Sequence, residues 1–141
     1  MSDELPLAAS SSGPEATAPP RPTILVVDDE AGVRVMVARM LSLSGYSVIS
    51  AQSGEEAVSI VQDYAAPIDL VVTDVRMPEM SGPEMVEQLQ KMRPGIRVMY
   101  MSAFSRDVLP AGVQDTDIPF LNKPFTMRTL ALSVLETLRR S

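Results

Sequence analysis

From residue 23 onward, short apolar runs alternate with longer segments in which apolar residues recur at the helical period. The apolar runs are rich in β-branched residues and nearly uninterrupted, as parallel strands covered on both faces should be. This alternation predicts βα units wound around one parallel sheet. The predicted strands are Ile24–Val27, Tyr46–Ser50, Asp69–Thr73, Arg97–Ser102 and Pro119–Asn122.

The helical segments carry start and stop signals. A first helix is predicted from Ala31 to Ser44, with Gly45 as its stop. A serine followed three residues later by a glutamate forms a capping box, and this pattern marks the next two helices at Ser53 and Ser81. Thr126 is placed to cap the last helix. We therefore expect five strands and about five helices.

One helical segment is interrupted. Between Arg106 and Asp117 the chain contains Pro110 and Gly112, both of which disfavour a continuous helix. The fourth helix is therefore predicted to be short or irregular.

The first 22 residues differ in composition from the rest. They hold five of the twelve prolines and a run of three serines, with little that could be buried. We expect a disordered Pro/Ser-rich tail over residues 1–22. A single domain is expected over residues 23–141, because 45% apolar content in a chain of 141 residues is enough for a core.

The composition excludes several kinds of chemistry. Without cysteine there are no disulfides or thiolate metal sites, and without histidine any phosphohistidine donor must be another chain. The net charge of −6 and the scattered arginines argue against nucleic acid as a partner. No basic leader and no apolar run near the ~18 residues of a membrane span are found, so we expect a cytoplasmic protein without membrane association.

Polar side chains follow the ends of the predicted strands. Asp28 and Asp29 follow the first strand and Asp74 the third, and these two ends are neighbours where a doubly wound sheet reverses its strand order. Ser102 and Lys123 follow the fourth and fifth strands at the same edge. Taken singly, an Asp pair is most often a helix N-cap, such a serine structural and such a lysine solvated. Their joint placement favours a site for Mg²⁺ and a phosphoryl group.

These motifs, in this order, resemble the receiver domain of two-component response regulators over residues 22 to about 140. The stretches Thr73–Gly82 and Pro119–Phe125 are most similar to receivers at the C-terminal end of hybrid histidine kinases, although here the module is expected to stand alone. The resemblance implies a flavodoxin-like (βα)5 fold, a doubly wound parallel sheet of five strands in the order 2-1-3-4-5.

The resemblance also implies roles for individual residues. Asp74 would be the phosphoacceptor, attacking a phosphohistidine or a small phosphodonor to form an aspartyl phosphate. Mg²⁺ would be bound by Asp29, Asp74 and the backbone carbonyl of Arg76, with Asp28 acting through water. Lys123 would pair with a phosphoryl oxygen.

A second set of residues is implied in switching and in the phosphoryl lifetime. Ser102 and Phe120 occupy the switch positions, where tyrosine is common in place of Phe120, and Pro124 would follow a cis peptide bond. Arg76 and Phe104 occupy positions that shape how fast water reaches the acyl phosphate. We hypothesise that bulky Phe104 shields the phosphoryl group and slows autodephosphorylation.

Other functions fit the residues less well. A phosphatase of the haloacid dehalogenase type needs a second acid where this chain has Arg76, and the acidic run Asp28–Glu30 would repel a flavin phosphate. The main alternative is a receiver-fold interaction module that is not phosphorylated. Expected partners are a histidine kinase or histidine phosphotransfer protein and an unknown downstream protein, with room for a homodimer through the last helix. The chain is expected to be no enzyme in the usual sense, although it would assist its own phosphorylation and dephosphorylation.

Overall fold

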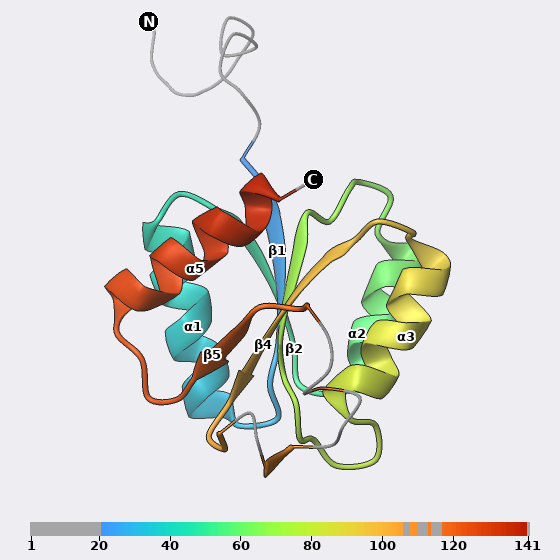
Figure 1. The fold of residues 1–141 in the computed structure, drawn as a ribbon. Helices are drawn as coiled ribbons and strands as arrows, with labels where there is room; N and C mark the ends of the chain where they lie inside the picture. Colours follow the sequence, from blue (N-terminus) through green and yellow to red (C-terminus); the bar gives the residue numbers. More distant parts are fainter. Residues whose placement is uncertain (1–20, 106–107, 110–112, 114–116, 141) are drawn as a thin grey trace, which may run out of the picture.

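The computed structural model describes residues 21–105, 108–109, 113 and 117–140. Within them, five parallel strands form one sheet in the order β2-β1-β3-β4-β5 (Figure 1). The predicted flavodoxin-like architecture and its strand order are confirmed. The elements are β1 (Thr23–Val27), α1 (Ala31–Leu43), β2 (Ser47–Ala51), α2 (Gly54–Asp63), β3 (Leu70–Asp74), α3 (Gly82–Met92), β4 (Arg97–Ser102), β5 (Phe120–Asn122) and α5 (Met127–Arg139).

The sheet lies between two helix layers, with α1 and α5 on one face and α2 and α3 on the other (Figure 1). Successive side chains of a strand point to opposite faces. In β1, Ile24 and Val26 accordingly pack in the core under α1 and α5, while Leu25 and Val27 pack under α2 and α3. Because both faces are covered, every residue of this strand must be apolar or small, which explains the uninterrupted apolar run in the sequence.

The predicted helix signals at Gly45, Ser81 and Thr126 are confirmed, and the capping box predicted at Ser53 is only half formed. Gly45 adopts a φ of +100° just after α1, a conformation that glycine reaches without strain. Ser81 and Glu84 form the complete capping box of α3, and the Thr126 side chain caps α5 by accepting from Thr129 N–H. At α2 the box is shifted, because the Glu56 carboxylate accepts from the N–H of Gln52 rather than from that of Ser53.

Two predictions cannot be compared with the structure. The tail expected over residues 1–22 falls almost wholly outside the described residues, and so does most of the irregular helix expected between Arg106 and Asp117. The longest described helices, α1 and α5, have 13 residues each. In the described part of the chain, no helix combines the length and the apolar character that a membrane crossing requires.

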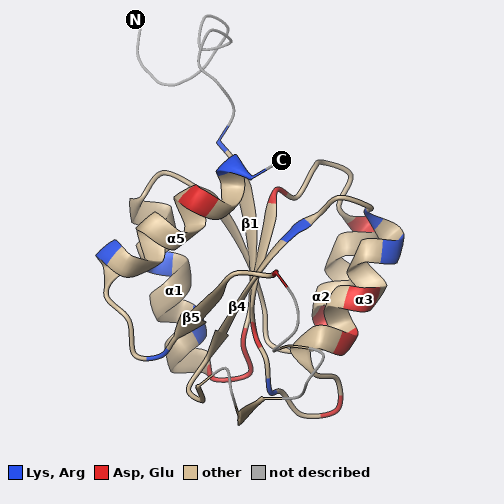
Figure 2. Cartoon of the chain, in the orientation of Figure 1, with Lys and Arg blue, Asp and Glu red and all other residues tan. Residues whose placement is uncertain are grey.

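Charged side chains divide between the two helix layers (Figure 2). The arginines that lie within described helices are all in α1 and α5, whereas most acidic helix residues lie on α2 and α3. The helices α1 and α5 contain one acidic residue, Glu136, and four arginines: Arg34, Arg39, Arg128 and Arg139. The helices α2 and α3 contain one basic residue, Lys91, and five acidic residues: Glu55, Glu56, Asp63, Glu84 and Glu87. The net negative charge is therefore not spread evenly over the fold.

The start of α3 packs tightly against the end of β3. The Gly82 N–H donates to the carbonyl of Val75 at 2.8 Å, and a Cβ atom added at Gly82 would lie 2.3 Å from the backbone oxygen of Asp74. Backbone atoms cannot move aside as a flexible side chain can, so only glycine fits here. This contact fixes the position of Asp74 relative to α3.

We predict that Gly82→Ala lowers the free energy of unfolding by about 1–3 kcal/mol, because the new methyl group overlaps backbone. Gly32→Ala is the matched control. No atom lies within 4 Å of the Cβ position at Gly32, so alanine in α1 should raise stability by up to about 1 kcal/mol. Urea unfolding followed by circular dichroism measures both. Equal stability of the two variants would contradict the close approach at Gly82.

Candidate phosphoryl-transfer site

The register of β1 and β3 brings three carboxylates together. Val27 pairs with Thr73, so Asp28 follows β1 beside Asp74 at the end of β3. Carboxylate oxygens of Asp28, Asp29 and Asp74 all lie within 4.8 Å of one another. The convergence predicted from the sequence is therefore present in the structure.

The three carboxylates differ in their surroundings. Asp28 is fully buried, and both of its oxygens have partners: Oδ1 accepts from the Glu30 N–H at 2.9 Å, and Oδ2 accepts from Lys123 Nζ at 2.9 Å. Asp74 is 8% exposed, and Asp29 is exposed to solvent. Asp28 is thus held in place by the protein, whereas Asp29 is free to meet a ligand from solvent.

Lys123 links the carboxylates from the end of β5. Its Nζ lies 2.9 Å from Asp28, 3.4 Å from Asp74 and 3.9 Å from the Glu30 carboxylate. Burial on its own would lower the pKa of Lys123, but the hydrogen bond with Asp28 and the charge of Asp74 together raise it. The amine therefore stays protonated beside Asp74.

The backbone around Lys123 fixes where its side chain starts. The Lys123 N–H donates to the carbonyl of Ser102 at 2.8 Å, which ties the end of β5 to the end of β4. The Lys123–Pro124 peptide bond is cis, as the sequence led us to expect.

Burial raises the pKa of Asp74 to about 6. The positive charge of Lys123 opposes this rise, and the negative charge of Asp28 adds to it. A partly desolvated carboxylate next to other acids is stabilised by a cation. Ligand oxygens of Mg²⁺ lie about 2.0–2.1 Å from the ion, so carboxylate oxygens that lie within 4.8 Å of one another are close enough to share one ion, directly or through a water. The donor set, oxygen atoms only, also suits this ion.

A hydrogen bond links Ser102, the last residue of β4, to Phe104 in the loop that follows. Ser102 is 1% exposed, and its hydroxyl accepts from the Phe104 N–H at 3.0 Å. The Phe104 carbonyl accepts from the side-chain amide of Asn122 at 2.9 Å. The Ser102 hydroxyl and the Asn122 amide thus each hold one backbone group of Phe104, the N–H and the carbonyl.

The Phe104 side chain has a partner that the sequence did not reveal. Phe104 is 46% exposed, and the guanidinium of Arg76 lies over its ring at 4.4 Å from the centroid. Sequence analysis singled out both residues separately, but nothing in their spacing indicated a cation–π contact. The loops after β3 and β4 are thus joined by their side chains.

The other predicted switch residue, Phe120, is half-buried and packs against the core under α2 and α3. Sequence analysis missed two contributors to the site. Glu30 supplies an N–H to Asp28, and the Arg34 guanidinium donates to the Asp28 carbonyl at 2.8 Å. Arg34 begins the second turn of α1 and has no motif of its own, so only the fold reveals its position.

An apolar hollow adjoins the site. It has a volume of about 330 Å³ and is lined by Val33, Met36, Ala103, Lys123, Pro124 and Phe125. Lys123 lines the hollow and also pairs with Asp28 and Asp74. The hollow therefore opens directly beside the carboxylates.

Comparison with known proteins places the geometry in context. The family model of the response regulator receiver domain matches residues 24–135. The chain is 40% identical over 122 residues to the sensor kinase CckA of Brucella abortus, a match that covers 84% of this chain and 13% of the kinase. It is 33% identical over 119 residues to the transcriptional regulatory protein GlrR of Escherichia coli, a match that covers 84% of this chain and 26% of GlrR. The chain thus spans a small part of these relatives.

Solved structures of receiver domains also resemble this chain. The receiver domain of the hybrid histidine kinase CckA is 36% identical with a TM-score of 0.70, and 83% of this chain and 99% of that one are covered. A receiver domain protein of Clostridium thermocellum is 27% identical with a TM-score of 0.74, and the match covers 84% of this chain and 95% of that one. With the sheet order and the strand-end carboxylates, these matches lead to one conclusion: the chain belongs to the response regulator receiver domain family.

Proposed function

We propose that this chain is a phosphoacceptor that takes a phosphoryl group on Asp74 and signals through the resulting change in its surface. The observation that carries the proposal is the position of the Asp74 carboxylate, 3.4 Å from the protonated Lys123 amine and within 4.8 Å of two other acids. Such a site can hold a cation and a phosphoryl group together.

In the proposed reaction, an oxygen of Asp74 attacks the phosphorus of a phosphohistidine on another chain. The new O–P bond gives an acyl phosphate, and the N–P bond breaks, so the electron pair returns to the imidazole, which takes up a proton. Lys123 neutralises negative charge on the phosphoryl oxygens. Asp28 keeps the amine in place through its 2.9 Å hydrogen bond.

Mg²⁺, when bound, would supply the charge that offsets the phosphoryl oxygens. Asp29, Asp74 and the Arg76 backbone carbonyl are the proposed ligands, with Asp28 acting through water. The exposure of Asp29 and the two occupied oxygens of Asp28 support this division.

The proposed output begins at Ser102. When its hydroxyl turns to the phosphoryl group, it gives up the hydrogen bond from Phe104 N–H, and the backbone of Phe104 then keeps the hydrogen bond from Asn122 to its carbonyl. Phe120, half-buried on the neighbouring strand, can then turn inward. The donor would be a histidine kinase or a histidine phosphotransfer protein, and the cytoplasmic location expected from the sequence remains a prediction.

With Mg²⁺ and acetyl phosphate, we predict that the native chain gains one phosphoryl group and that Asp74→Asn gains none. Intact-mass spectrometry measures the product. Asp63→Asn is the control, because Asp63 is an exposed carboxylate at the end of α2. Absence of any gain, or a gain that persists in Asp74→Asn, would leave the unphosphorylated interaction module as the better account.

We predict that Phe104→Ala shortens the lifetime of the aspartyl phosphate by about three- to tenfold, because the ring and the guanidinium stacked on it keep water from the phosphorus. Arg76→Ala should have an effect in the same direction, since it removes the other half of the contact. Loss of phosphate after removal of the donor gives the lifetime. An unchanged or longer lifetime in Phe104→Ala would refute the shielding hypothesis.

Stability without metal should depend on the ionisation of Asp74. An unperturbed aspartate has a pKa of 3.8, and burial raises the pKa of Asp74 to about 6 in the folded chain. Between these values the folded state binds more protons than the unfolded state, so stability falls as pH rises through this window. Asparagine cannot ionise. Asp74→Asn should therefore exceed the native stability by about 1–3 kcal/mol above pH ~6, and the difference should close below pH ~4.

Urea unfolding in EDTA at about pH 4 and about pH 7.5 measures this difference, with Asp63→Asn as the control that should show none. A stability difference for Asp74→Asn that does not change with pH, or that grows toward acid, would show that burial of the Asp74 charge is not the cause.

A further inference from the structure

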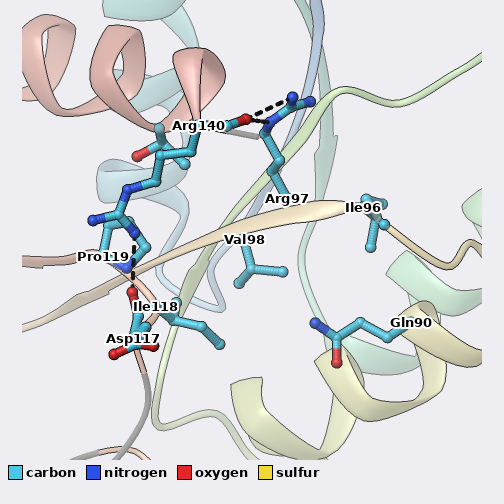
Figure 3. Close-up of a pocket in the computed structure, with 10 residues that line it drawn as sticks. Gln90, Ile96, Arg97, Val98, Asp117, Ile118, Pro119 and Arg140 are labelled. Carbon is cyan, nitrogen blue, oxygen red and sulfur yellow. Dashed lines mark hydrogen bonds between the residues drawn. The ribbon is translucent and has the colours of Figure 1, made fainter.

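A second cavity, whose lining Figure 3 shows, lies at the other end of the strands from Asp74, because Asp74 ends β3 and the cavity includes Arg97, which begins β4. It has a volume of about 350 Å³ and is formed where β4 begins, just before β5, at the C-terminal ends of α3 and α5. Ser102 ends β4 at the phosphoryl-transfer site, whereas Arg97, the first residue of β4, lines this cavity. We refer to it as the far cavity.

Two guanidinium groups line the far cavity, and their hydrogen bonds go to backbone carbonyls. Arg97 donates from Nε and Nη2 to the Arg140 carbonyl at 3.1 and 2.8 Å, and Arg140 donates from Nη1 to the Asp117 carbonyl at 3.0 Å (Figure 3). A guanidinium has five N–H donors. Within the described part of the chain, most donors of both groups therefore have no protein acceptor.

Among the described residues, every ion pair involves Lys123. Neither guanidinium therefore has a carboxylate partner there. The Asp117 carboxylate is part of the lining and is exposed, but it lies outside ion-pair distance of both groups. The charged residues of the lining are thus two cations and one anion in a chain with a net charge of −6. An anion is the ligand that these charges favour.

The rest of the lining is largely apolar. Ile96 and Val98 are 8% and 5% exposed, and Ile118 and Pro119 are half-buried beside them. The volume falls at the lower end of the range for small-molecule sites, about 300–1,000 Å³. A bare inorganic anion would use the guanidinium groups but would leave this apolar surface uncovered.

From this combination we propose that the far cavity binds a small organic carboxylate with a compact apolar body. The carboxylate would accept from the guanidinium groups of Arg97 and Arg140, for which the planar fork of arginine is well suited. The apolar body would cover Ile96 and Val98. This site shares no residue with the phosphoryl-transfer site, so its binding can be measured on the unphosphorylated chain.

The test is a titration of the unphosphorylated ¹⁵N-labelled chain, followed by amide chemical shifts. Hexanoate is the probe, acetate carries the same charge without the apolar body, and hexylamine carries the apolar body with the opposite charge. We expect hexanoate to move the amides of Ile96, Val98 and Thr137 saturably and to bind at least about fivefold more tightly than acetate. Hexylamine should leave these amides unmoved.

Paired variants locate the charge. Arg140→Gln should weaken hexanoate about tenfold, as loss of one charge-assisted hydrogen bond would. Arg139→Gln is the matched control, because Arg139 is the exposed neighbour in α5 and does not line the cavity. Arg97→Gln should also weaken binding, and its amide spectrum reports whether α5 stays folded.

Three results would overturn the proposal. The first is the absence of saturable shifts at the cavity amides, and the second is equal binding of acetate and hexanoate. The third is an equal loss of affinity in Arg139→Gln and Arg140→Gln, which would indicate general attraction to a basic surface rather than a defined site.

Discussion

The site depends on one charge balance, the position of a single ammonium group between two buried carboxylates. Lys123 lies 2.9 Å from Asp28 and 3.4 Å from Asp74, and both acids are largely removed from water. Two buried like charges at neighbouring strand ends would repel each other without a cation. Lys123 offsets part of this repulsion but leaves the pKa of Asp74 at about 6. The site is thus incompletely neutralised, which is a condition that favours the binding of a further cation.

The parallel sheet holds these groups together at the carboxyl ends of its strands. β1, β3, β4 and β5 run parallel, so the residues that follow them converge without any long loop. Backbone contacts then set the details, such as the close approach of Gly82 to Asp74 and the hydrogen bond from Lys123 N–H to Ser102. The hydroxyl of Ser102 holds the Phe104 backbone in turn. In the proposed function, a change at Asp74 would reach the surface through these contacts.

Much of this arrangement could be predicted from the sequence because it depends on local signals. Apolar runs identify strands buried on both faces, the Ser81 capping box marks the start of α3, and polar residues at strand ends identify the site. Contacts between side chains far apart in the chain could not be predicted. The stacking of Arg76 on Phe104, the support of Asp28 by Arg34 and the far cavity all depend on how loops and helix ends pack, which no periodicity encodes.

The central claim is that Asp74, rather than one of its acidic neighbours, forms the covalent bond to phosphorus. Borohydride reduction of the phosphorylated chain converts an aspartyl phosphate to homoserine, and peptide mass spectrometry then locates the modified residue. Our account predicts homoserine at position 74 alone. Homoserine at position 28 or 29, or phosphate retained on a residue that borohydride does not reduce, would contradict it.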